Sequence, residues 1–318
     1  MLHRTLGTSG MDISAIGLGT WAIGGWMWGG QDDAASVDAI HAAVDGGVNW
    51  IDTAPIYGSG HSETMVGRAL KAMSGSNRPF VFTKYGLGDD SSVRRFSASR
   101  QDVLSECNAS LKRLGVDRID LYQLHWPAPQ DIAETAGACE TLLTSGKIRA
   151  VGVSNFSVAQ LEAWQSTGVP LHSLQSPYSI LRPAVAADVI PWSKRNALGV
   201  LAYSPLFRGL LFGTWSRDKT FPADDARGDH KDYQGARFQR HLDAVDELKT
   251  VAAEGGLSVA QLAVGTLLHT SGVTGCIVGA RTRAQGAAIA ELGVTISDAQ
   301  ASAVWVIMDR LRADLATM

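Results

Sequence analysis

The sequence has few cysteines, no excess of basic residues and no long apolar run. Its three cysteines, Cys107, Cys139 and Cys276, form no Cys-x-x-Cys pair, which argues against a disulfide framework and against a zinc site. The formal net charge is −3, whereas proteins that bind nucleic acid usually carry a basic stripe. No segment reaches the roughly 18 apolar residues of a membrane span. We therefore expect no nucleic-acid or membrane partner, and a small-molecule substrate instead.

The amino terminus also lacks the apolar core of a secretion signal, because residues 1–10 mix polar residues with glycines. This and the unpaired cysteines favour a cytoplasmic protein. The chain does have 318 residues, 45% of them hydrophobic, which is enough to bury one large core. It contains no low-complexity linker, so we expect a single domain over residues 1–318. The sequence does not indicate an oligomeric state.

Eight short apolar runs alternate with segments whose apolar residues have helical spacing. This alternation is typical of a parallel sheet covered by helices, and eight such units close into a (β/α)8 barrel, the TIM barrel of the α/β class. We expect strands at residues 14–18, 48–51, 80–83, 119–124, 150–153, 172–174, 200–202 and 276–278. We also expect an N-terminal hairpin on the barrel floor, a long loop after the seventh strand at residues 207–239, and a C-terminal helix at residues 297–318.

Polar residues follow most of these strands. The carboxyl ends of barrel strands meet on one rim, where active sites of this fold are built. Asp52 ends the second strand with Tyr57 one loop later, Lys84 follows the third, and His125 follows the fourth. Taken singly, Asp52 is compatible with a turn cap, Tyr57 with a loop anchor and His125 with a core histidine. Their joint placement on one rim favours a catalytic constellation.

These four residue types suit the reduction of a carbonyl group. Negative charge grows on the oxygen as hydride arrives at the carbon, and a positioned acid lowers the barrier by donating a proton. We expect Lys84 to lower the pKa of Tyr57, and Asp52 to keep Lys84 charged by ion pairing.

The residues from Gly17 to Ala22 match the loose glycine fingerprint of dinucleotide-binding proteins. That fingerprint requires a helix to begin inside the motif, so that the helix amino terminus faces the pyrophosphate. Here glycines and tryptophans continue as far as Gly30, and we expect no helix before about Asp32. A Rossmann site is therefore not predicted.

The segments around Asp52, Lys84 and His125, together with residues 152–156 and Gln175, resemble the aldo-keto reductase family of bacterial NADP-dependent oxidoreductases over nearly the whole chain. The resemblance implies reversible reduction of aldehydes and ketones to alcohols with NADPH. It implies that Tyr57 is the proton donor and that Lys84 and Asp52 together adjust the pKa of Tyr57. It also implies that His125 orients the substrate carbonyl. It implies no metal.

The resemblance also implies a cofactor groove. Its residues are Thr20, Trp21, Asp52, Ser154, Asn155, Gln175 and Tyr203 for the nicotinamide end, Ser204, Pro205, Leu206, Arg208 and Gly209 for the pyrophosphate, Gly279, Arg281 and Gln285 for the adenosine end, and Arg227 as a further phosphate contact. Arg281 suits a 2′-phosphate, which favours NADPH, although a solvated arginine at a helix start is the alternative. Many relatives carry Glu-Asn where this chain has Ala288 and Ile289, so NADH stays open.

Aromatic residues on the rim loops predict an apolar substrate pocket, although several of them could only shield the barrel top. The expected substrate contacts are Trp21, Trp26, Tyr57, His125, Trp126 and Phe156.

Two alternative functions are compatible with a barrel of this kind. The fold also serves nicotinamide-sensing regulatory subunits with slow turnover, which the intact catalytic set disfavours. A metal-dependent hydrolase would need a ligand cluster that the sequence lacks.

Overall fold

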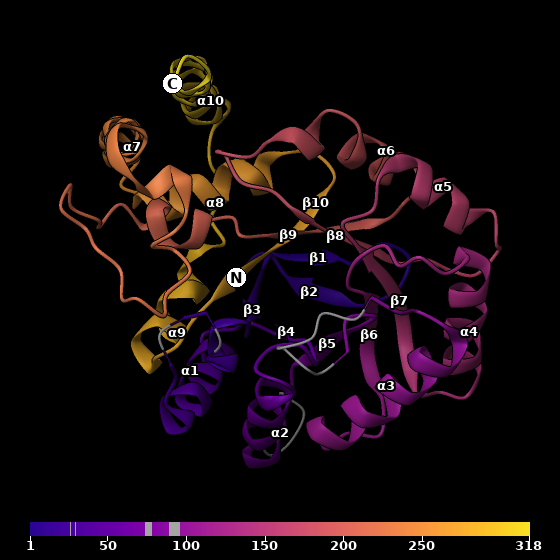
Figure 1. The fold of residues 1–318 in the computed structure, drawn as a ribbon. Coiled ribbons are helices and arrows are strands. Elements are labelled where there is room, and N and C mark those ends of the chain that lie inside the picture. Colours follow the sequence, from indigo (N-terminus) through magenta and orange to yellow (C-terminus); the bar gives the residue numbers. More distant parts are fainter. Residues whose placement is uncertain (26, 29, 74–77, 89–95) are drawn as a thin grey trace.

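The computed structural model describes residues 1–25, 27–28, 30–73, 78–88 and 96–318. Eight parallel strands form a closed barrel in chain order, and the last strand pairs with the first (Figure 1). The barrel strands are β3 (Ile16–Gly19), β4 (Trp50–Asp52), β5 (Phe80–Tyr85), β6 (Ile119–Leu124), β7 (Ile148–Ser154), β8 (Ser173–Pro177), β9 (Gly199–Tyr203) and β10 (Val273–Gly279). Each overlaps one of the eight expected runs, so the prediction of a TIM barrel is confirmed.

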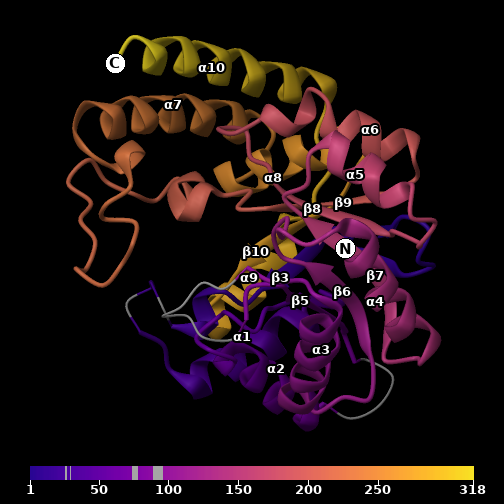
Figure 2. The same ribbon diagram turned by 45° about the vertical axis from the view of Figure 1, so that its right-hand side comes forward.

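Helices cover the outside of the barrel. They are α1 (Asp33–Asp45), α2 (His61–Ala72), α3 (Arg100–Leu114), α4 (Ile132–Thr144), α5 (Val158–Gln165), α6 (Val189–Arg195), α7 (Gly235–Glu254), α8 (Val259–His269), α9 (Arg283–Ile289) and α10 (Asp298–Ala316). Short 3-10 helices lie at η1 (Ala22–Gly24), η2 (Ala184–Ala186), η3 (Phe207–Phe212), η4 (Lys231–Tyr233) and η5 (Ala290–Leu292). The C-terminal helix α10 lies beside α7, and both lie outside α8 (Figure 2). The expected long loop contains η3 and η4 and gives way to α7 at Gly235.

The N-terminal hairpin closes the floor of the barrel. Its strands, β1 (His3–Thr5) and β2 (Asp12–Ser14), are antiparallel. Leu6, Met11 and Ile13 are fully buried in one cluster with the inward side chains of the barrel strands. Removing these three side chains from water stabilises the closed floor, because each buried aliphatic side chain contributes about 1.5–3 kcal/mol. The predicted floor hairpin is therefore present.

The glycines of the apparent dinucleotide fingerprint serve packing inside the barrel. A Cβ atom on Gly17 would lie 2.2 Å from the indole of Trp50, which fills the barrel interior. The first α-helix begins only at Asp33, where the Asp32 side chain accepts a hydrogen bond from the Ala35 amide. Between the fingerprint and α1, the described residues form only the short 3-10 helix η1.

All three cysteines are buried free thiols, and burial raises the pKa of each to about 12. They lie in the layer between the strands and the helices. Within the described residues, no single helix is long and apolar enough to cross a membrane. The helices α7 and α8 together meet that length and composition, but they are bent by 82° at the break between them.

Candidate active site

The predicted catalytic residues form the barrel layer directly above its apolar floor. Side chains alternate between the two faces of a strand, so residues two positions apart point the same way. Trp50 and Phe82 lie in the floor cluster, and Asp52 and Lys84 follow them on the same face of β4 and β5. Asp52 is 3% exposed and Lys84 is fully buried. The strand ends thus bring a carboxylate and an ammonium together inside the barrel.

The ammonium of Lys84 uses its three donors on three acceptors. Its Nζ donates to Asp52 Oδ1 at 2.5 Å, to the backbone oxygen of Thr53 at 3.0 Å and to the Tyr57 hydroxyl at 3.3 Å. A lysine has no further hydrogen to donate, so its position is fixed. Because the Tyr57 oxygen accepts from Lys84, the phenolic hydrogen has to point elsewhere. Tyr57 is therefore arranged as a donor toward a third group.

The pKa values of this pair follow from burial and charge. Burial raises the pKa of Tyr57, and although Lys84 acts to lower it, the net shift is upward from the ordinary value of 10.0. Lys84 acts in the expected direction, but desolvation of the phenolate outweighs the ammonium, so the pKa of Tyr57 does not fall below its ordinary value. Burial acts to lower the pKa of Lys84, but Asp52 and Tyr57 outweigh it and the net shift is upward. At neutral pH the phenol is protonated and the lysine charged.

Two glutamine amides hold the second oxygen of the Asp52 carboxylate. Gln175 Nε2 donates to Asp52 Oδ2 at 2.8 Å, and Gln123 Nε2 donates to the same oxygen at 3.2 Å. Gln123 also accepts from Gln175 at 3.3 Å. A buried carboxylate costs much less when its oxygens accept hydrogen bonds from fixed donors. Gln123 was not predicted from the sequence, although Leu121 in the floor cluster places it on the inward face of β6.

His125 lies on the rim beside the phenol. Its ring is 5.8 Å from the Tyr57 ring between centroids, at an interplanar angle of 81°. Its backbone is fixed on both sides, since its amide donates to the oxygen of Tyr85 and its oxygen accepts from Asn155 Nδ2 at 3.0 Å. The imidazole and the phenol therefore face the same space above the barrel.

Three of the residues predicted for the nicotinamide form a hydrogen-bonded row on the rim, next to His125. The Tyr203 hydroxyl donates to Asn155 Oδ1 at 2.9 Å, and Asn155 Nδ2 donates to Ser154 Oγ at 3.0 Å. Asn155 has a left-handed backbone, with φ of 64°, directly after β7. Burial raises the pKa of Tyr203 to about 12, so its ring stays neutral.

Thr20 follows Gly19, the partner of Asp52 in the pairing of β3 with β4, and supports Asp52. Its amide and its hydroxyl both donate to the backbone oxygen of Asp52, at 3.0 and 2.9 Å. Ser62 at the start of α2 donates to the Thr20 hydroxyl at 2.7 Å. Thr20 is fully buried. Its contacts thus fix the strand end that carries the carboxylate, while its predicted contact with a cofactor stays a prediction.

The loop after β9, predicted to hold a pyrophosphate, has an unusual backbone. Ser204 and Arg208 are left-handed, with φ of 55° and 52°, and Gly209 has φ of 112°. Pro205 and Leu206 are buried beneath them. The Arg208 guanidinium lies over the Trp21 ring at 5.6 Å. The loop therefore places a cation next to the rim.

Arg227 is already bound by the protein. Its guanidinium pairs with Asp225, with Nη2 at 2.6 Å from Oδ2, and lies 5.0 Å from the Trp28 ring. Trp28 and Asp225 also form a backbone bridge between the loop after β3 and the loop after β9. Arg227 thus ties two rim loops together. A phosphate contact by Arg227 would have to share the guanidinium with Asp225.

Arg281, predicted to bind a 2′-phosphate, likewise contacts protein groups. Nε donates to Gln31 Oε1 at 2.7 Å, Nη1 donates to the Trp28 oxygen at 2.8 Å, and Nη2 donates to the Gly30 oxygen. Its amide donates to Gln285 Oε1 at 2.8 Å. Gly279, also predicted for the adenosine end, is exposed at the end of β10. A phosphate at Arg281 would replace these loop oxygens.

Some of the predicted substrate residues lie on the rim near Tyr57, and others do not. Trp21 lies 6.4 Å from the Tyr57 ring, and Trp126 is 43% exposed on the rim. Phe156 is 3% exposed and packs against Trp164 between the barrel and its helices, so its predicted contact with substrate is not supported. The left-handed Asn155 directly before it breaks the alternation of the strand. Trp26 lies outside the described residues.

The chain from residue 15 to residue 307 matches the family model described as "Aldo/keto reductase family". The chain belongs to the aldo/keto reductase family. Members of this family are oxidoreductases that use nicotinamide cofactors and act on small carbonyl compounds.

Two curated relatives and a solved structure match the chain over nearly its whole length. It is 39% identical over 317 residues to the aldo-keto reductase YhdN of Bacillus subtilis, which covers 99% of this chain and 96% of the relative. It is 34% identical to the NADH-specific methylglyoxal reductase of Escherichia coli, over 93% of this chain and 95% of the relative. The solved structure of the glycerol dehydrogenase AKR11B4 from Gluconobacter oxydans superimposes with a TM-score of 0.88 at 40% identity, covering 97% and 95% of the two chains.

Metal ligands do not cluster in the described part of the chain, where no group of three or more His, Cys, Asp and Glu side chains could hold a metal ion. Three buried side-chain polar atoms of the described residues lack a hydrogen-bond partner, namely Ser173 Oγ, Ser193 Oγ and Trp28 Nε1, and the last of these belongs to a rim loop. It lies beside the guanidinium of Arg227. A buried donor next to a cation suits an anionic group.

Proposed function

We propose that this reductase catalyses the reversible reduction of small aldehydes and ketones to alcohols, with NADPH as cofactor and Tyr57 as the proton donor. The observation that carries the proposal is the contact of one buried ammonium, Lys84, with both the Asp52 carboxylate and the Tyr57 hydroxyl. Such a contact leaves the phenolic hydrogen directed away from Lys84, as a proton donor requires. The bound cofactor would supply hydride to the carbonyl carbon.

The chain's own residues account for the remaining steps. Tyr57 gives its proton to the carbonyl oxygen as negative charge develops there, and Lys84 stabilises the phenolate that is left. Asp52 keeps Lys84 charged, and two glutamine amides keep Asp52 in place. His125, facing the same space as Tyr57, donates a hydrogen bond that orients the carbonyl oxygen. No step requires a metal ion.

The residues of the rim fit a nicotinamide dinucleotide. The amide and hydroxyl groups of Ser154, Asn155 and Gln175 match a carboxamide, which both donates and accepts hydrogen bonds. The Tyr203 ring, kept neutral, offers a flat face for stacking. Arg208 and the unpartnered Trp28 Nε1 supply donors for phosphate groups.

NADPH is the proposed cofactor because Arg281 ends the eighth βα connection, where a 2′-phosphate would be recognised. Two observations make NADH the necessary comparison: the Arg281 guanidinium is hydrogen-bonded to the loop after β3, and a relative is named as NADH-specific.

The names of the relatives also suggest the first substrates to test, which are methylglyoxal for reduction and glycerol for oxidation. The proposed location is the cytoplasm, in keeping with three free thiols.

The proposal is tested by steady-state assays of a carbonyl panel with NADPH and NADH in parallel. We expect turnover of reactive aldehydes such as methylglyoxal and a nitrobenzaldehyde. Tyr57→Phe should lower kcat by roughly 10²–10⁴-fold, the usual contribution of a positioned acid, with cofactor affinity retained. Full activity of Tyr57→Phe would refute the mechanism. Tight cofactor binding without turnover of any carbonyl would favour the regulatory subunit instead.

A further inference from the structure

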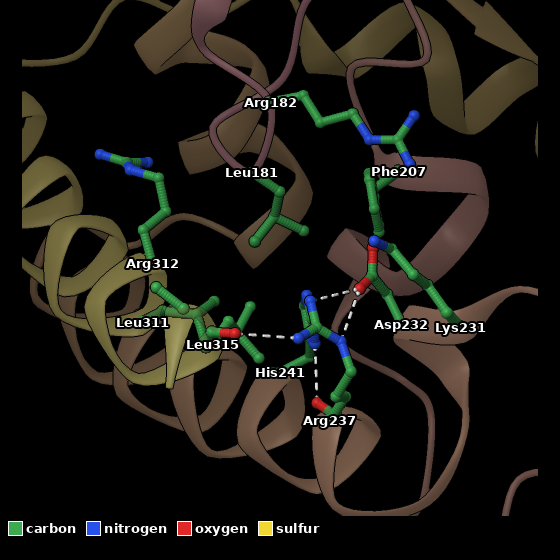
Figure 3. Close-up of a pocket in the computed structure, with 11 residues that line it drawn as sticks. Leu181, Arg182, Phe207, Lys231, Asp232, Arg237, His241, Leu311, Arg312 and Leu315 are labelled. Atoms are coloured by element: carbon green, nitrogen blue, oxygen red, sulfur yellow. Dashed lines mark hydrogen bonds and ion pairs between the residues drawn. The ribbon is translucent and has the colours of Figure 1, made fainter. Parts of the chain in front are cut away.

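A cavity outside the proposed catalytic and cofactor sites lies between α7, α10 and the 3-10 helices η3 and η4 (Figure 3). Its volume is about 370 Å³, within the range of small-molecule sites. None of the predicted catalytic or cofactor residues lines it. Its walls come from segments far apart in the chain, so the folded molecule alone creates it.

Basic side chains dominate this cavity. Arg182, Lys231, Arg237 and Arg312 line it, against the single carboxylate of Asp232. Figure 3 shows Arg237 bound to the acceptors within the cavity: Asp232 Oδ1 at 3.0 Å from Nη2, and the backbone oxygen of Leu315 at 3.0 Å from Nη1. The local carboxylate is thus neutralised by Arg237, and the other three basic residues are not balanced by it.

These three basic residues have few strong partners. The guanidinium of Arg182 lies over the Phe207 ring at 4.9 Å, and its Nη2 is 3.1 Å from His230 Nε2, which leaves its other donors for a ligand. Arg312 donates to the Ile180 oxygen at 3.3 Å and pairs with Asp309 outside the cavity. Over the described ranges, the ammonium of Lys231 makes no hydrogen bond or ion pair. The cavity therefore carries an excess of positive charge with donors available to a ligand.

The rest of the cavity wall is apolar. Leu181, Leu311 and Leu315 face it, together with the ring of Phe207. A ligand that fits would combine an anionic group with a short carbon skeleton. Guanidinium and ammonium groups that converge on one space suit the three oxygens of a phosphate, which can accept from several donors at once.

We propose that this cavity binds a small phosphate ester, with the phosphate between Lys231, Arg182 and Arg312 and the carbon skeleton against the leucines. This binding is distinct from the proposed carbonyl reduction and does not depend on it. The ligand would touch Phe207, the residue before Arg208 in the proposed pyrophosphate loop. The site thus adjoins the proposed pyrophosphate loop through Phe207.

The test is isothermal titration calorimetry with sn-glycerol 3-phosphate, and glycerol as the uncharged control, on protein saturated with NADP⁺ so that the cofactor groove is filled. The variants are Lys231→Gln and Arg312→Gln. The matched controls are Lys249→Gln on α7 and Arg310→Gln on α10, which remove the same charges from side chains that do not line the cavity. Thermal unfolding midpoints of all four variants check that they fold.

We expect saturable binding of the phosphate ester and not of glycerol. Each cavity variant should weaken it at least about tenfold, the effect of losing one hydrogen bond to a charged group, and the controls should leave it unchanged. The proposal is overturned by the absence of saturable binding, or by equal affinity in cavity variants and controls. Because the localisation rests on the variants, failure of NADP⁺ to bind would count against the proposed reductase function and not against this site.

Discussion

At the scale of single residues, the protonation of Tyr57 decides the pH dependence of the proposed reaction. Burial outweighs Lys84 and raises the pKa of Tyr57 above 10.0. Reduction needs the protonated phenol, which is fully present below this pKa and lost as the pH rises through it. Oxidation of an alcohol needs the phenolate, which is scarce at neutral pH.

We therefore expect kcat/KM for alcohol oxidation to rise about tenfold per pH unit from pH ~7 to pH ~10, with no plateau. Over the same interval kcat/KM for aldehyde reduction should stay nearly constant. The measurement is a pH profile of both directions in buffers of constant ionic strength. A plateau of the oxidation rate near neutral pH would show that Lys84 dominates and that the pKa of Tyr57 is lowered.

Gln123 is a positioning residue in this scheme, because it acts through Asp52. Gln123→Met keeps the length of the side chain and removes the donor to Asp52 Oδ2. We expect kcat for reduction to fall about tenfold, the loss of a hydrogen bond to a charged group, with KM for the cofactor unchanged. Leu121→Met, two residues earlier on the same face of β6, is the control for packing and should keep normal kcat. Equal kcat in the two variants would exclude a positioning role.

Single residues were predictable where the strand pattern fixes their direction. Asp52 and Lys84 were found because they end strands, and the same alternation would have found Gln123 from Leu121. Phe156 is buried against Trp164 because the left-handed Asn155 turns the chain, which no periodicity reveals. The partners of Arg281 are backbone oxygens of a distant loop, and backbone oxygens carry no signal in the sequence.

At the scale of elements, the loop that carries Tyr57 is held by close contact between two backbones. Gly58 has φ of 64°, and a Cβ atom there would lie 2.3 Å from the oxygen of Gly24 in η1. A Cβ atom on Gly24 would in turn lie 2.7 Å from the backbone carbon of Tyr57. The backbones of η1 and the Tyr57 loop can come this close only because both residues are glycine. The position of η1 therefore sets the distance of the Tyr57 hydroxyl from Lys84.

Gly58→Ala should therefore displace Tyr57 and lower kcat/KM about 10²-fold, the effect expected of a shift near 1 Å at a reacting group. Gly115→Ala is the matched control, because Gly115 has the same φ of 64° with no atom within 4 Å of the added Cβ. It should reproduce the backbone strain without the loss of activity. Similar kcat/KM values for the two variants would contradict the role of η1, and steady-state kinetics with one aldehyde suffices.

The elements themselves follow closely from the sequence. The helices α3, α4 and α5 fall on segments with helical spacing of apolar residues, and the side chains of Ser99, Asp131 and Ser157 cap their first turns. The bridge between Trp28 and Asp225 was not predictable, because it joins two irregular loops by backbone contacts. Periodic sequence patterns predict helices and strands, but they do not predict backbone contacts between irregular loops.

At the scale of the whole molecule, one buried and two partly buried histidines should make the fold sensitive to acid. Burial lowers the pKa of His172, His230 and His241 below the ordinary value of 6.5. Above pH 6.5 both folded and unfolded chains carry neutral imidazoles, and stability does not change through them. Below it, the unfolded chain binds protons that the folded chain does not, so stability is lost until the folded pKa values are reached.

The unfolding midpoint should fall as the pH drops from about 7 to about 5. His172→Asn should reduce this fall, because an asparagine oxygen can accept the hydrogen bond that His172 Nδ1 takes from the Val151 amide, and asparagine does not titrate. Differential scanning calorimetry at several pH values measures both proteins. If the unfolding midpoint of His172→Asn falls as steeply as that of the wild type, His172 does not contribute to the acid sensitivity.

The barrel was predictable from the rhythm of eight apolar runs, whereas the packing of α7 against α10 was not. Nothing in the sequence of either helix identifies the other as its neighbour, and the cavity between them exists only after folding.

The pairing of β3 with β10 also has a consequence during synthesis. The first barrel strand, β3, cannot pair with β10 until β10 has been synthesised. At 5–20 residues per second, β10 leaves the ribosome roughly tens of seconds after β3. Until then the growing sheet has two open edges and an apolar interior above its hairpin. The nascent chain is therefore exposed to edge pairing with its neighbours, and this protein should depend on holdase chaperones while it is being made, however stable it is once closed.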